Sequence, residues 1–580
     1  MASGPVRLWA PRAETVDVVV DGGRMATIRN ERGWVTSVAA IEAGERYAFS
    51  LDDGEPMPDP RSHRQPDGVF GSSEVVDHDA FVWTDRAWHG MHLPAAVLYE
   101  LHVGTFTAGG SFRSAIERLP ELVELGVTAI ELMPVAAFDG ERGWGYDGVL
   151  LHAVHEPYGG PAGLKELVDA AHGLGLGVLL DVVWNHLGPT GNRLAELGPY
   201  FDDATQTPWG VAVNLDGPGC DEVRRFLLDS AALWLGDYHL DGLRLDAVHA
   251  LVDTSPTHLL SQLEREVRIQ SAHVGRPLWL IAESDANDPR LTGVREAGGY
   301  GLHAQWADDL HHAIHVAVTG ERQGYYADYC GAPDVVAAYE RGFVFDGRWS
   351  EARQRRVGAS TVGMGRDRFV TCTQNHDQVG NRARGDRLAQ VAGPDAARVA
   401  AALLLVAPGV PMLFMGEEWA ASTPFPYFVG ARNDELDDAV RRGRIAEFAA
   451  FGWDPDDIPD PVDEATMHAA VLRWEERAGP EHAAVIAWYR ALIELRRQEP
   501  DLTDPTPGVA RGAASPSALW VRRGAIELVA NVGAETAVID VVGAERSLLL
   551  TNSDCTLVSD TAVTLAPMSV AIFRCAPAPG

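Results

Sequence analysis

Three acidic residues that lie far apart in the chain each follow a short apolar run. Asp246 follows Gly-Leu-Arg-Leu, Glu283 follows Leu-Trp-Leu-Ile-Ala, and Asp377 comes shortly after Phe-Val-Thr-Cys. Arg244 stands two residues before Asp246, so on a strand both side chains point to the same face. If these runs are parallel strands of one barrel, the carboxyl groups meet at its mouth.

Carboxyl groups in this arrangement suit glycoside hydrolysis with retention, which uses a nucleophile and an acid roughly 5–5.5 Å apart. Asp246 would attack the anomeric carbon, and Glu283 would protonate the leaving oxygen and later deprotonate water. Glu283 then needs a pKa raised by burial and like charge, whereas Arg244 would keep Asp246 ionised. Asp377 would hold sugar hydroxyls and stabilise the oxocarbenium-like transition state.

Each of these residues also has a simpler interpretation. A single Asp after a strand is usually a helix N-cap or a turn residue. A histidine beside an apolar run is usually packed in the core or on the surface, and this applies to His186 and His376. The functional interpretation depends on four strand ends carrying the same polar chemistry in the register of one barrel.

The elements that must position these residues are short apolar runs that alternate with helical patterns. Eight such runs suggest a (β/α)₈ barrel, whose active site lies at the carboxyl ends of its strands. A doubly wound sheet would give the same alternation, but the number of runs and the placement of the acids favour the barrel. The expected strands are 95–102, 127–135, 177–184, 241–248, 277–284, 301–307, 368–376 and 408–416.

Helical periodicity appears between the strands, and short alternating runs flank the barrel on both sides. The expected helices are 113–125, 163–174, 221–235, 256–268, 395–406 and 482–497. The expected domains are a β-sandwich at 1–85, the barrel at 86–500 and an antiparallel β-domain at 501–580. A short insertion at 187–220 follows strand 3, and a long one at 417–480 follows strand 8.

The composition excludes several classes of partner. With 82 acidic and 48 basic residues the net charge is -34, which repels phosphate backbones and anionic lipids. Nucleic acid and membrane are therefore not expected as partners. Five scattered cysteines form no disulfide framework or zinc motif, and no leader or spanning segment is seen, which together predict a cytoplasmic protein.

The strand ends resemble the signature regions of the α-amylase superfamily, in the same order and spacing. The tyrosine of Gly143 to Asp147 matches the residue that stacks on the sugar in that superfamily. The matching segments are DVVWNH at 181–186, GLRLDAVH at 242–249, IAES at 281–284 and NHDQVGNR at 375–382.

Within the superfamily the chain is most similar to the malto-oligosyltrehalose trehalohydrolase family. That family cleaves the α-1,4 bond next to the terminal trehalose of maltooligosyl trehalose. The segments that carry this resemblance are 207–218, 281–290, 305–322, 374–387, 412–428 and 447–453.

The resemblance implies roles for individual residues. It makes Asp246 the nucleophile, Glu283 the proton donor and Asp377 the transition-state stabiliser. The residues expected to bind substrate are Tyr146, Asp147, His186, Trp209, Arg244, His249, Asp309, His311, His312, His376, Gln378 and Asn381. Of these, Asp309, His311 and His312 are expected near the reducing-side subsites, although they also read as the polar start of a helix at 309–319.

No cofactor or metal is expected. Some α-amylases bind calcium through the residue that corresponds to Asn185, but the nearby Asp202 and Asp203 do not form an alternating ligand loop. The expected substrates are maltooligosyl trehalose and related α-1,4-glucans, and a maltooligosyl trehalose synthase is the expected functional partner.

Two other functions remain open. A glycogen branching enzyme or another transglycosylase would share the barrel and all three carboxyl groups, because only the acceptor that resolves the covalent intermediate differs. A catalytically inactive glycan-binding protein is the second, although such relatives usually lose a carboxyl group and none is missing here.

Overall fold

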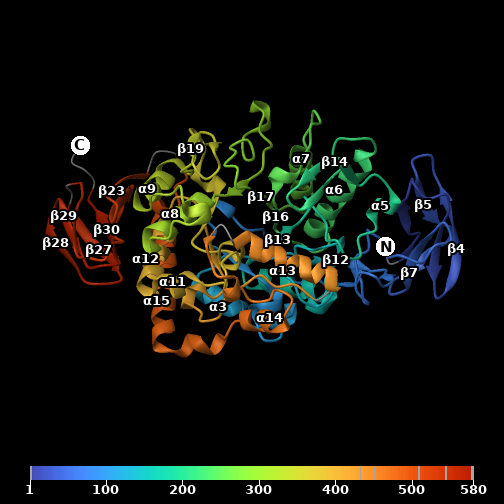
Figure 1. Ribbon diagram of the computed structural model, residues 1–580, viewed down its shortest axis with the longest axis horizontal. Helices are drawn as coiled ribbons and strands as arrows, with labels where there is room; N and C mark the ends of the chain where they lie inside the picture. The colour runs from blue at the N-terminus through green and yellow to red at the C-terminus, as the bar shows by residue number, and fades with distance from the viewer. Residues whose placement is uncertain (1–2, 431–432, 449–450, 507–509, 543–544, 577–580) are drawn as a thin grey trace.

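The computed structural model describes residues 3–430, 433–448, 451–506, 510–542 and 545–576. The molecule is elongated, with N-terminal strands at one end, a barrel in the middle and C-terminal strands at the other end (Figure 1). In the described part no helix is long and apolar enough to cross a membrane.

Eight parallel strands close into a barrel, as the alternation of apolar and helical runs predicts. Every one of these strands falls within an expected range, which decides between the barrel and the doubly wound sheet. In order around the barrel they are β9 (Leu98–Leu101), β10 (Ala129–Leu132), β13 (Gly177–Val182), β16 (Gly242–Leu245), β17 (Trp279–Ala282), β18 (Ala304–Trp306), β21 (Phe369–Cys372) and β22 (Val410–Phe414).

The barrel interior has an apolar lower layer and a charged upper layer. Leu98, Ala129 and Leu179 belong to one buried cluster inside the barrel. Two residues further along their strands, on the same faces, stand Glu100, Glu131 and Asp181, all buried. On each of these strands the next inward-facing residue is therefore acidic, and it lies nearer the carboxyl end, where the active site of a barrel is found.

Helices surround the barrel at the expected places. One expectation needs correction: the helix predicted at 113–125 is broken into α2 and α3 because Pro120, which lacks an N–H, starts a new helix. The main helices are α2 (Phe112–Ile116), α3 (Leu119–Leu125), α4 (Gly160–Gly173), α6 (Cys220–Gly236), α7 (Leu259–Val274), α8 (Asp308–Thr319), α12 (Pro394–Leu405) and α15 (Pro480–Gln498).

The N-terminal region forms an antiparallel six-stranded sheet in which one strand changes partner. The first half of β4 pairs with β3, and its second half pairs with β5. The strand order is β2 (Arg7–Trp9), β5 (Trp34–Ser37), β4 (Gly23–Arg29), β3 (Val16–Val20), β7 (Arg46–Leu51) and β8 (Ser73–Glu74).

The C-terminal region forms two antiparallel sheets, of which the larger packs against the barrel helices and the smaller packs on the larger. Buried Arg523 donates hydrogen bonds to the carbonyls of Val406 and Ala407, just after α12, where a cation is favourable. One sheet is β23 (Ala510–Ala514), β24 (Ala518–Arg523), β25 (Ile526–Asn531), β30 (Ser569–Cys575) and β27 (Arg546–Thr551). The other is β26 (Ala537–Asp540), β29 (Ala562–Leu565) and β28 (Cys555–Ser559).

The insertions carry small elements of their own. The segment after β13 contains α5 (Leu194–Leu197) and the hairpin of β14 (Phe201–Thr207) and β15 (Gly210–Val213). The segment after β22 contains α13 (Asp434–Phe448) and α14 (Glu464–Ala470). A further connection, between α8 and β21, contains α9 (Ala332–Arg341), β19 (Arg348–Ser350) and β20 (Arg355–Val357), none of which the sequence analysis singled out.

Candidate active site

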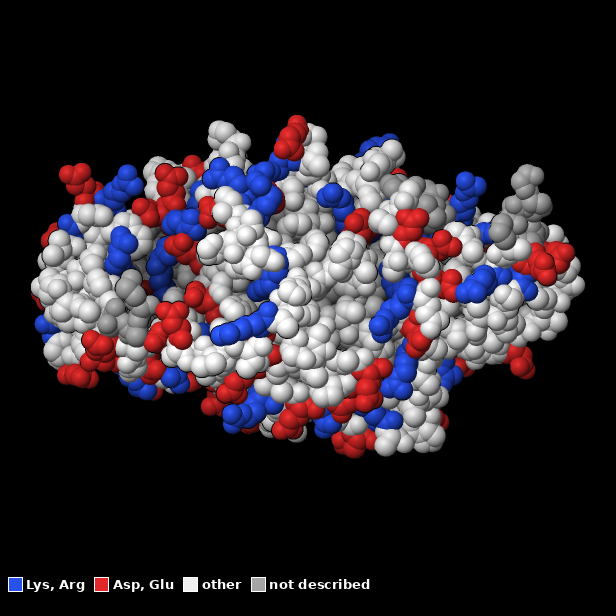
Figure 2. All heavy atoms as spheres, turned by 180° about the vertical axis from the view of Figure 1, so that it is seen from behind, with Lys and Arg blue, Asp and Glu red and all other residues white. Residues whose placement is uncertain are grey.

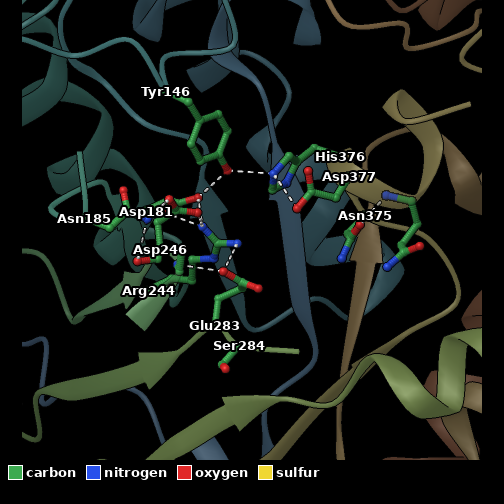
Figure 3. Close-up of polar contacts among 12 residues, drawn as sticks. Tyr146, Asp181, Asn185, Arg244, Asp246, Glu283, Ser284, Asn375, His376 and Asp377 are labelled. Carbon is green, nitrogen blue, oxygen red and sulfur yellow. Dashed lines mark hydrogen bonds and ion pairs between the residues drawn. The ribbon is translucent and has the colours of Figure 1, made fainter. Parts of the chain in front are cut away.

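The three acidic residues meet at the carboxyl ends of neighbouring strands. Asp246 directly follows β16, Glu283 directly follows β17, and Asp377 lies in α10 (His376–Gly380) after β21. Leu245 pairs with Ala282 in the barrel register, which sets Asp246 beside Glu283. Figure 3 shows the three side chains turned toward one region, where polar contacts through other residues join them.

Arg244 connects the carboxyl groups, and it is wholly buried. Its Nη1 lies 2.7 Å from Asp246 Oδ1 and 2.8 Å from Asp181 Oδ2, and its Nη2 lies 3.7 Å from Glu283 Oε2. The guanidinium also stands 4.2 Å from the ring centre of Trp306. One buried cation therefore contacts three carboxyl groups from three strands, which offsets the cost of removing their charge from water.

Glu283 is in the state that an acid catalyst needs. Burial raises its pKa to about 8, and Asp246, Asp308 and Asp377 add to this rise against the opposing Arg244. The carboxyl group is therefore largely protonated at neutral pH and can donate a proton.

A strained backbone position supports Glu283. The N–H of Ala247 donates to Glu283 Oε2 at 2.7 Å. Ala247 has φ +40°, in the left-handed region that costs a residue with a side chain about 1 kcal/mol or more. That conformation directs the N–H that follows Asp246 toward the carboxyl group of the next strand.

Asp246 has donors on both sides. Besides Arg244, the amide of Asn185 donates to Asp246 Oδ2 at 2.9 Å. The side chain of Asp246 is 12% exposed, so a substrate atom can reach it from the mouth of the barrel. A carboxylate held by two donors and open on one side can act as a nucleophile.

Asp377 belongs to a second group of contacts on the opposite side of the mouth. The Nε2 of His376 lies 3.5 Å from Asp377 Oδ2 and 2.7 Å from the hydroxyl of Tyr146. Tyr146 in turn donates to Asp181 Oδ2 at 2.5 Å. This chain of contacts joins Asp377 to the Arg244 cluster, as the dashed lines in Figure 3 show.

The predicted residues His186, Trp209 and His249 form a group of rings at the rim. Trp209 stands in the turn between β14 and β15 and is 45% exposed. Its ring centre lies 6.0 Å from that of His186, in a stacked orientation, and 5.9 Å from that of His249. An exposed indole above two imidazoles offers a face on which a sugar ring can stack.

Asn381, Gln378 and Asp147 lie next to the predicted centre. The amide of Asn381 donates to Asp377 Oδ1 at 3.3 Å, and Arg444 of α13 donates to Asn381 Oδ1 at 2.9 Å. Gln378 is buried, and its backbone N–H is capped by Asn375. Burial lowers the pKa of the His186 ring, and the nearby charges of Asp246 and Asp147 oppose this.

Asp309 and His311 do not join the three acids. Asp309 is buried, and its oxygens accept hydrogen bonds from Tyr329, Asn287 and two backbone N–H groups. The ring of His311 contacts the Thr373 carbonyl and the Tyr326 hydroxyl. Both side chains hold neighbouring segments in place, because their polar atoms are already occupied by protein groups.

His312 lines a cavity of about 180 Å³, and so does Asp309, whereas His311 does not. Tyr325, Tyr329 and Arg353 line the same cavity, as does Asp285, two residues after Glu283. The cavity therefore lies beside the acid catalyst candidate. Its mixture of aromatic rings and charged groups suits a sugar.

Sequence reasoning missed Asp308, the residue before the predicted Asp309. Asp308 begins α8 two residues after β18 ends, and β18 lies between the strands that carry Glu283 and Asp377. Burial raises its pKa to about 7, and Asp377, Asp285 and Asp309 add to the rise. An acid after the sixth strand was a usable signal, because the three predicted acids were also chosen as acidic residues that follow barrel strands.

Glu100 and Asp181 were also missed as site residues. Burial raises the pKa of Asp181 to about 6 against the opposing Arg244. Glu100 stands in an apolar strand and contacts His376. The available signal was a charge within an otherwise apolar strand, on the face that points into the barrel.

Throughout the described ranges, no three or more His, Cys, Asp or Glu side chains are grouped so that they could hold a metal ion. Asn185, the position that raised the question of calcium, contacts Asp246 and His186 instead.

The comparisons with known proteins agree with this geometry. The family model for the catalytic domain of α-amylase matches residues 66–201. A malto-oligosyltrehalose trehalohydrolase of Arthrobacter ramosus is 51% identical, over 85% of this chain and 87% of its own. One from Mycobacterium tuberculosis is 46% identical, over 98% of this chain and 99% of its own. The crystal structure of a putative α-amylase from Salmonella typhimurium superposes with a TM-score of 0.91 at 39% identity, covering 99% and 98% of the two chains.

The closed barrel and the acids at its mouth, together with these relatives, define a glycoside hydrolase of the α-amylase superfamily. The chain belongs to the malto-oligosyltrehalose trehalohydrolase family within that superfamily.

Proposed function

We propose that the protein hydrolyses, with retention, the α-1,4 bond adjacent to the terminal trehalose of maltooligosyl trehalose. The products are trehalose and a shorter malto-oligosaccharide. The observation that carries this proposal is the contact of one buried guanidinium, Arg244, with both Asp246 and Glu283. It is supported by relatives that carry the trehalohydrolase name over nearly the whole chain.

The proposed reaction has two steps. Asp246 attacks the anomeric carbon while protonated Glu283 gives its proton to the glycosidic oxygen, so the bond to the leaving sugar breaks and a glycosyl ester forms. The ionised Glu283 then takes a proton from water, whose oxygen attacks the same carbon and releases Asp246. The raised pKa of Glu283 favours the first step, which needs a protonated carboxyl group. The nearby Arg244 favours the second step, which needs an ionised one.

Asp377 and its neighbours are proposed to bind the sugar at the cleavage point. The carboxylate of Asp377 is 43% exposed and so can accept bonds from sugar hydroxyls while it stabilises developing positive charge. Asn381 and His376 hold that carboxylate in place. Tyr146 supplies a ring beside His376 on which the sugar can stack.

The released disaccharide is proposed to occupy the cavity beside Glu283. His312, Tyr325 and Arg353 would then contact it directly. Asp309 also lines the cavity, but its oxygens are occupied by protein donors, so it would act, like His311, by fixing the cavity walls. The glucan chain would pass the exposed ring of Trp209 at the rim, near His186 and His249.

The remaining partners follow from charge and chemistry. Maltooligosyl trehalose must be made by an enzyme that converts the reducing end of a glucan to trehalose, so a maltooligosyl trehalose synthase is the proposed functional partner. The net charge of -34 argues against nucleic acid and anionic membranes. All five cysteines are unpaired, which suits a reducing cytoplasm.

Product analysis tests the proposal against its alternatives. The protein is incubated with maltooligosyl trehalose and, separately, with amylose. Free trehalose from the first substrate supports the proposal. Branched product from amylose without free trehalose would identify a transglycosylase, and glycan binding without turnover, unchanged in Asp246→Ala, would identify a binding protein.

A further inference from the structure

His376 is held between the buried Glu100 and the partly buried Tyr146 beneath the mouth of the barrel. Its ring Nδ1 lies 2.5 Å from Glu100 Oε1, and its backbone N–H donates to Glu100 Oε2 at 2.8 Å. Its Nε2 lies 2.7 Å from the hydroxyl of Tyr146. Both His376 and Glu100 are only 1% exposed, so water does not compete for the contacts between these two residues.

The hydrogen-bond directions fix the protonation of this ring. Tyr146 has a single O–H, and it donates to Asp181 Oδ2. The phenol oxygen can then only accept from His376 Nε2, which must carry a hydrogen. Glu100 accepts from the backbone with one oxygen and from Nδ1 with the other. Both ring nitrogens therefore donate, which only an imidazolium can do.

A second glutamate next to Glu100 has no such partners. Glu131 on β10 is the register neighbour of Glu100 on β9. It is 1% exposed, and among the described residues neither of its carboxyl oxygens has a hydrogen-bond partner. Burial raises its pKa well above the usual range, and Glu100 adds to the rise. The two adjacent glutamates thus differ in charge. Glu100 is ionised because the backbone N–H and the ring of His376 donate to it, and Glu131 is neutral because it has no donor.

We propose that Glu100 is a positioning residue for the reaction, which holds His376 as an imidazolium against Asp377 and Tyr146, while its neighbour Glu131 stays uncharged. The inference rests on the proposed function, because it assigns a task to a residue behind that site. The positive ring fixes the Asp377 carboxylate by charge, and it fixes Tyr146 by donating a hydrogen bond from Nε2 to the phenol oxygen. Glu100 acts through His376 and does not touch the substrate.

The surrounding charges agree with this assignment. Burial alone would lower the pKa of His376, but Asp377 and Glu100 outweigh it and raise the pKa to about 9. Arg244 opposes that rise. The other titratable groups that face the ring are His102, Glu131 and Asp181.

The charge on His376 should matter most at alkaline pH. In the wild type the ring keeps its proton above the pKa of Glu283, about 8, so loss of the acid proton sets the alkaline limb of activity. Without the Glu100 charge, burial dominates and the ring loses its proton first. The alkaline limb of Glu100→Gln should then move down by about one pH unit or more, a tenfold or greater loss of activity at the former midpoint.

The matched control is Glu131→Gln, the same substitution at the neighbouring register position. Because Glu131 is already neutral, its variant should keep the wild-type pH profile. Glu100→Asp keeps the charge and should keep the alkaline limb with a lower kcat. The profiles of kcat and KM are measured from pH 5 to 10 on whichever glucan the wild type hydrolyses, with circular dichroism to verify folding.

A measurement without substrate separates this inference from the proposed function. Histidine labelled with ¹³C and ¹⁵N reports the charge of His376, assigned with His376→Gln, as the pH is raised. We expect both ring nitrogens to be protonated at pH 7.5 in the wild type and in Glu131→Gln but not in Glu100→Gln. A neutral His376 in the wild type at pH 7.5, or equal effects of the two glutamine variants on the pH profile, would overturn the inference, even if trehalose release is confirmed.

Discussion

Two pairs of carboxyl groups follow barrel strands in this protein, and their surroundings differ. Asp246 and Glu283 follow β16 and β17, and their side chains are 12% and 15% exposed. Glu417 and Glu418 follow β22 and are 3% and 1% exposed. Burial raises the pKa of Glu283 and of Glu417 to about 8 and that of Glu418 to about 7. A raised pKa therefore does not by itself distinguish the candidate acid from a structural carboxyl group.

The partners of the two pairs make the distinction. Glu418 accepts from the Tyr99 hydroxyl, and Glu417 accepts from Tyr489 of α15 and from the backbone of Phe414. Hydroxyl and backbone donors therefore occupy the oxygens of Glu417 and Glu418, and both residues are buried in the fold. At the mouth, Arg244 contacts both acids and leaves one side of each open. Access and a shared cation, rather than burial, mark the pair that is suited to chemistry.

The largest expected effect would separate the pairs by activity. Asp246→Asn should lower kcat by about 10⁴-fold or more, because it removes the nucleophile while the contact with Asn185 can be kept. Glu418→Ala should instead keep kcat and lower the free energy of unfolding by about 1–3 kcal/mol, since the Tyr99 hydroxyl loses its acceptor. Kinetics and urea unfolding measure both. The comparison fails if Glu418→Ala loses turnover as fully as Asp246→Asn does.

A second test addresses the proton that Glu283 carries. Glu283→Gln should lower kcat by about 10²–10⁴-fold while glycan binding survives, because the shape is kept and the acid is lost. The wild-type activity should fall as the pH rises through about 8. The residual activity of the variant should lack this limb. Near-normal turnover by Glu283→Gln would reject Glu283 as the acid.

The smallest expected effect on activity belongs to a test of stability and pH. Glu417 has a folded pKa of about 8 against an ordinary value of 4.5, so the folded state binds a proton that the unfolded state releases between these values. Stability should therefore fall as pH rises from 4.5 to 8, by at most about 1.4 kcal/mol per pH unit for this group. Glu417→Gln should flatten the dependence of the urea midpoint on pH and leave the pH profile of activity unchanged. An unchanged slope would show that Glu417 is not the buried titrating group inferred here.

Much of this protein could be predicted from the sequence. The eight strands, the acids at three of their ends and the inward direction of Arg244 follow from local periodicity, because side chains alternate with a period of two on any strand. The break between α2 and α3 at Pro120 was overlooked although it is equally local.

Other features depend on which distant segments touch. Asp308 lies beside the acids after β17 and β21, while Asp309 turns toward Tyr329. Helix geometry separates the directions of two adjacent side chains by about 100°, but only the packing of α8 decides which of them faces the acids. Arg444 reaches Asn381 from α13, more than sixty residues later in the chain.

The sequence by itself determined the order of the strands and the chemical type of the group at each strand end. Only the tertiary structure decided which of two adjacent glutamates, Glu100 or Glu131, meets a donor, and which buried acids remain open to a substrate. The physical reason is that periodicity is a property of neighbouring residues. Desolvation and hydrogen-bond partners are set by groups that come together only when the barrel closes.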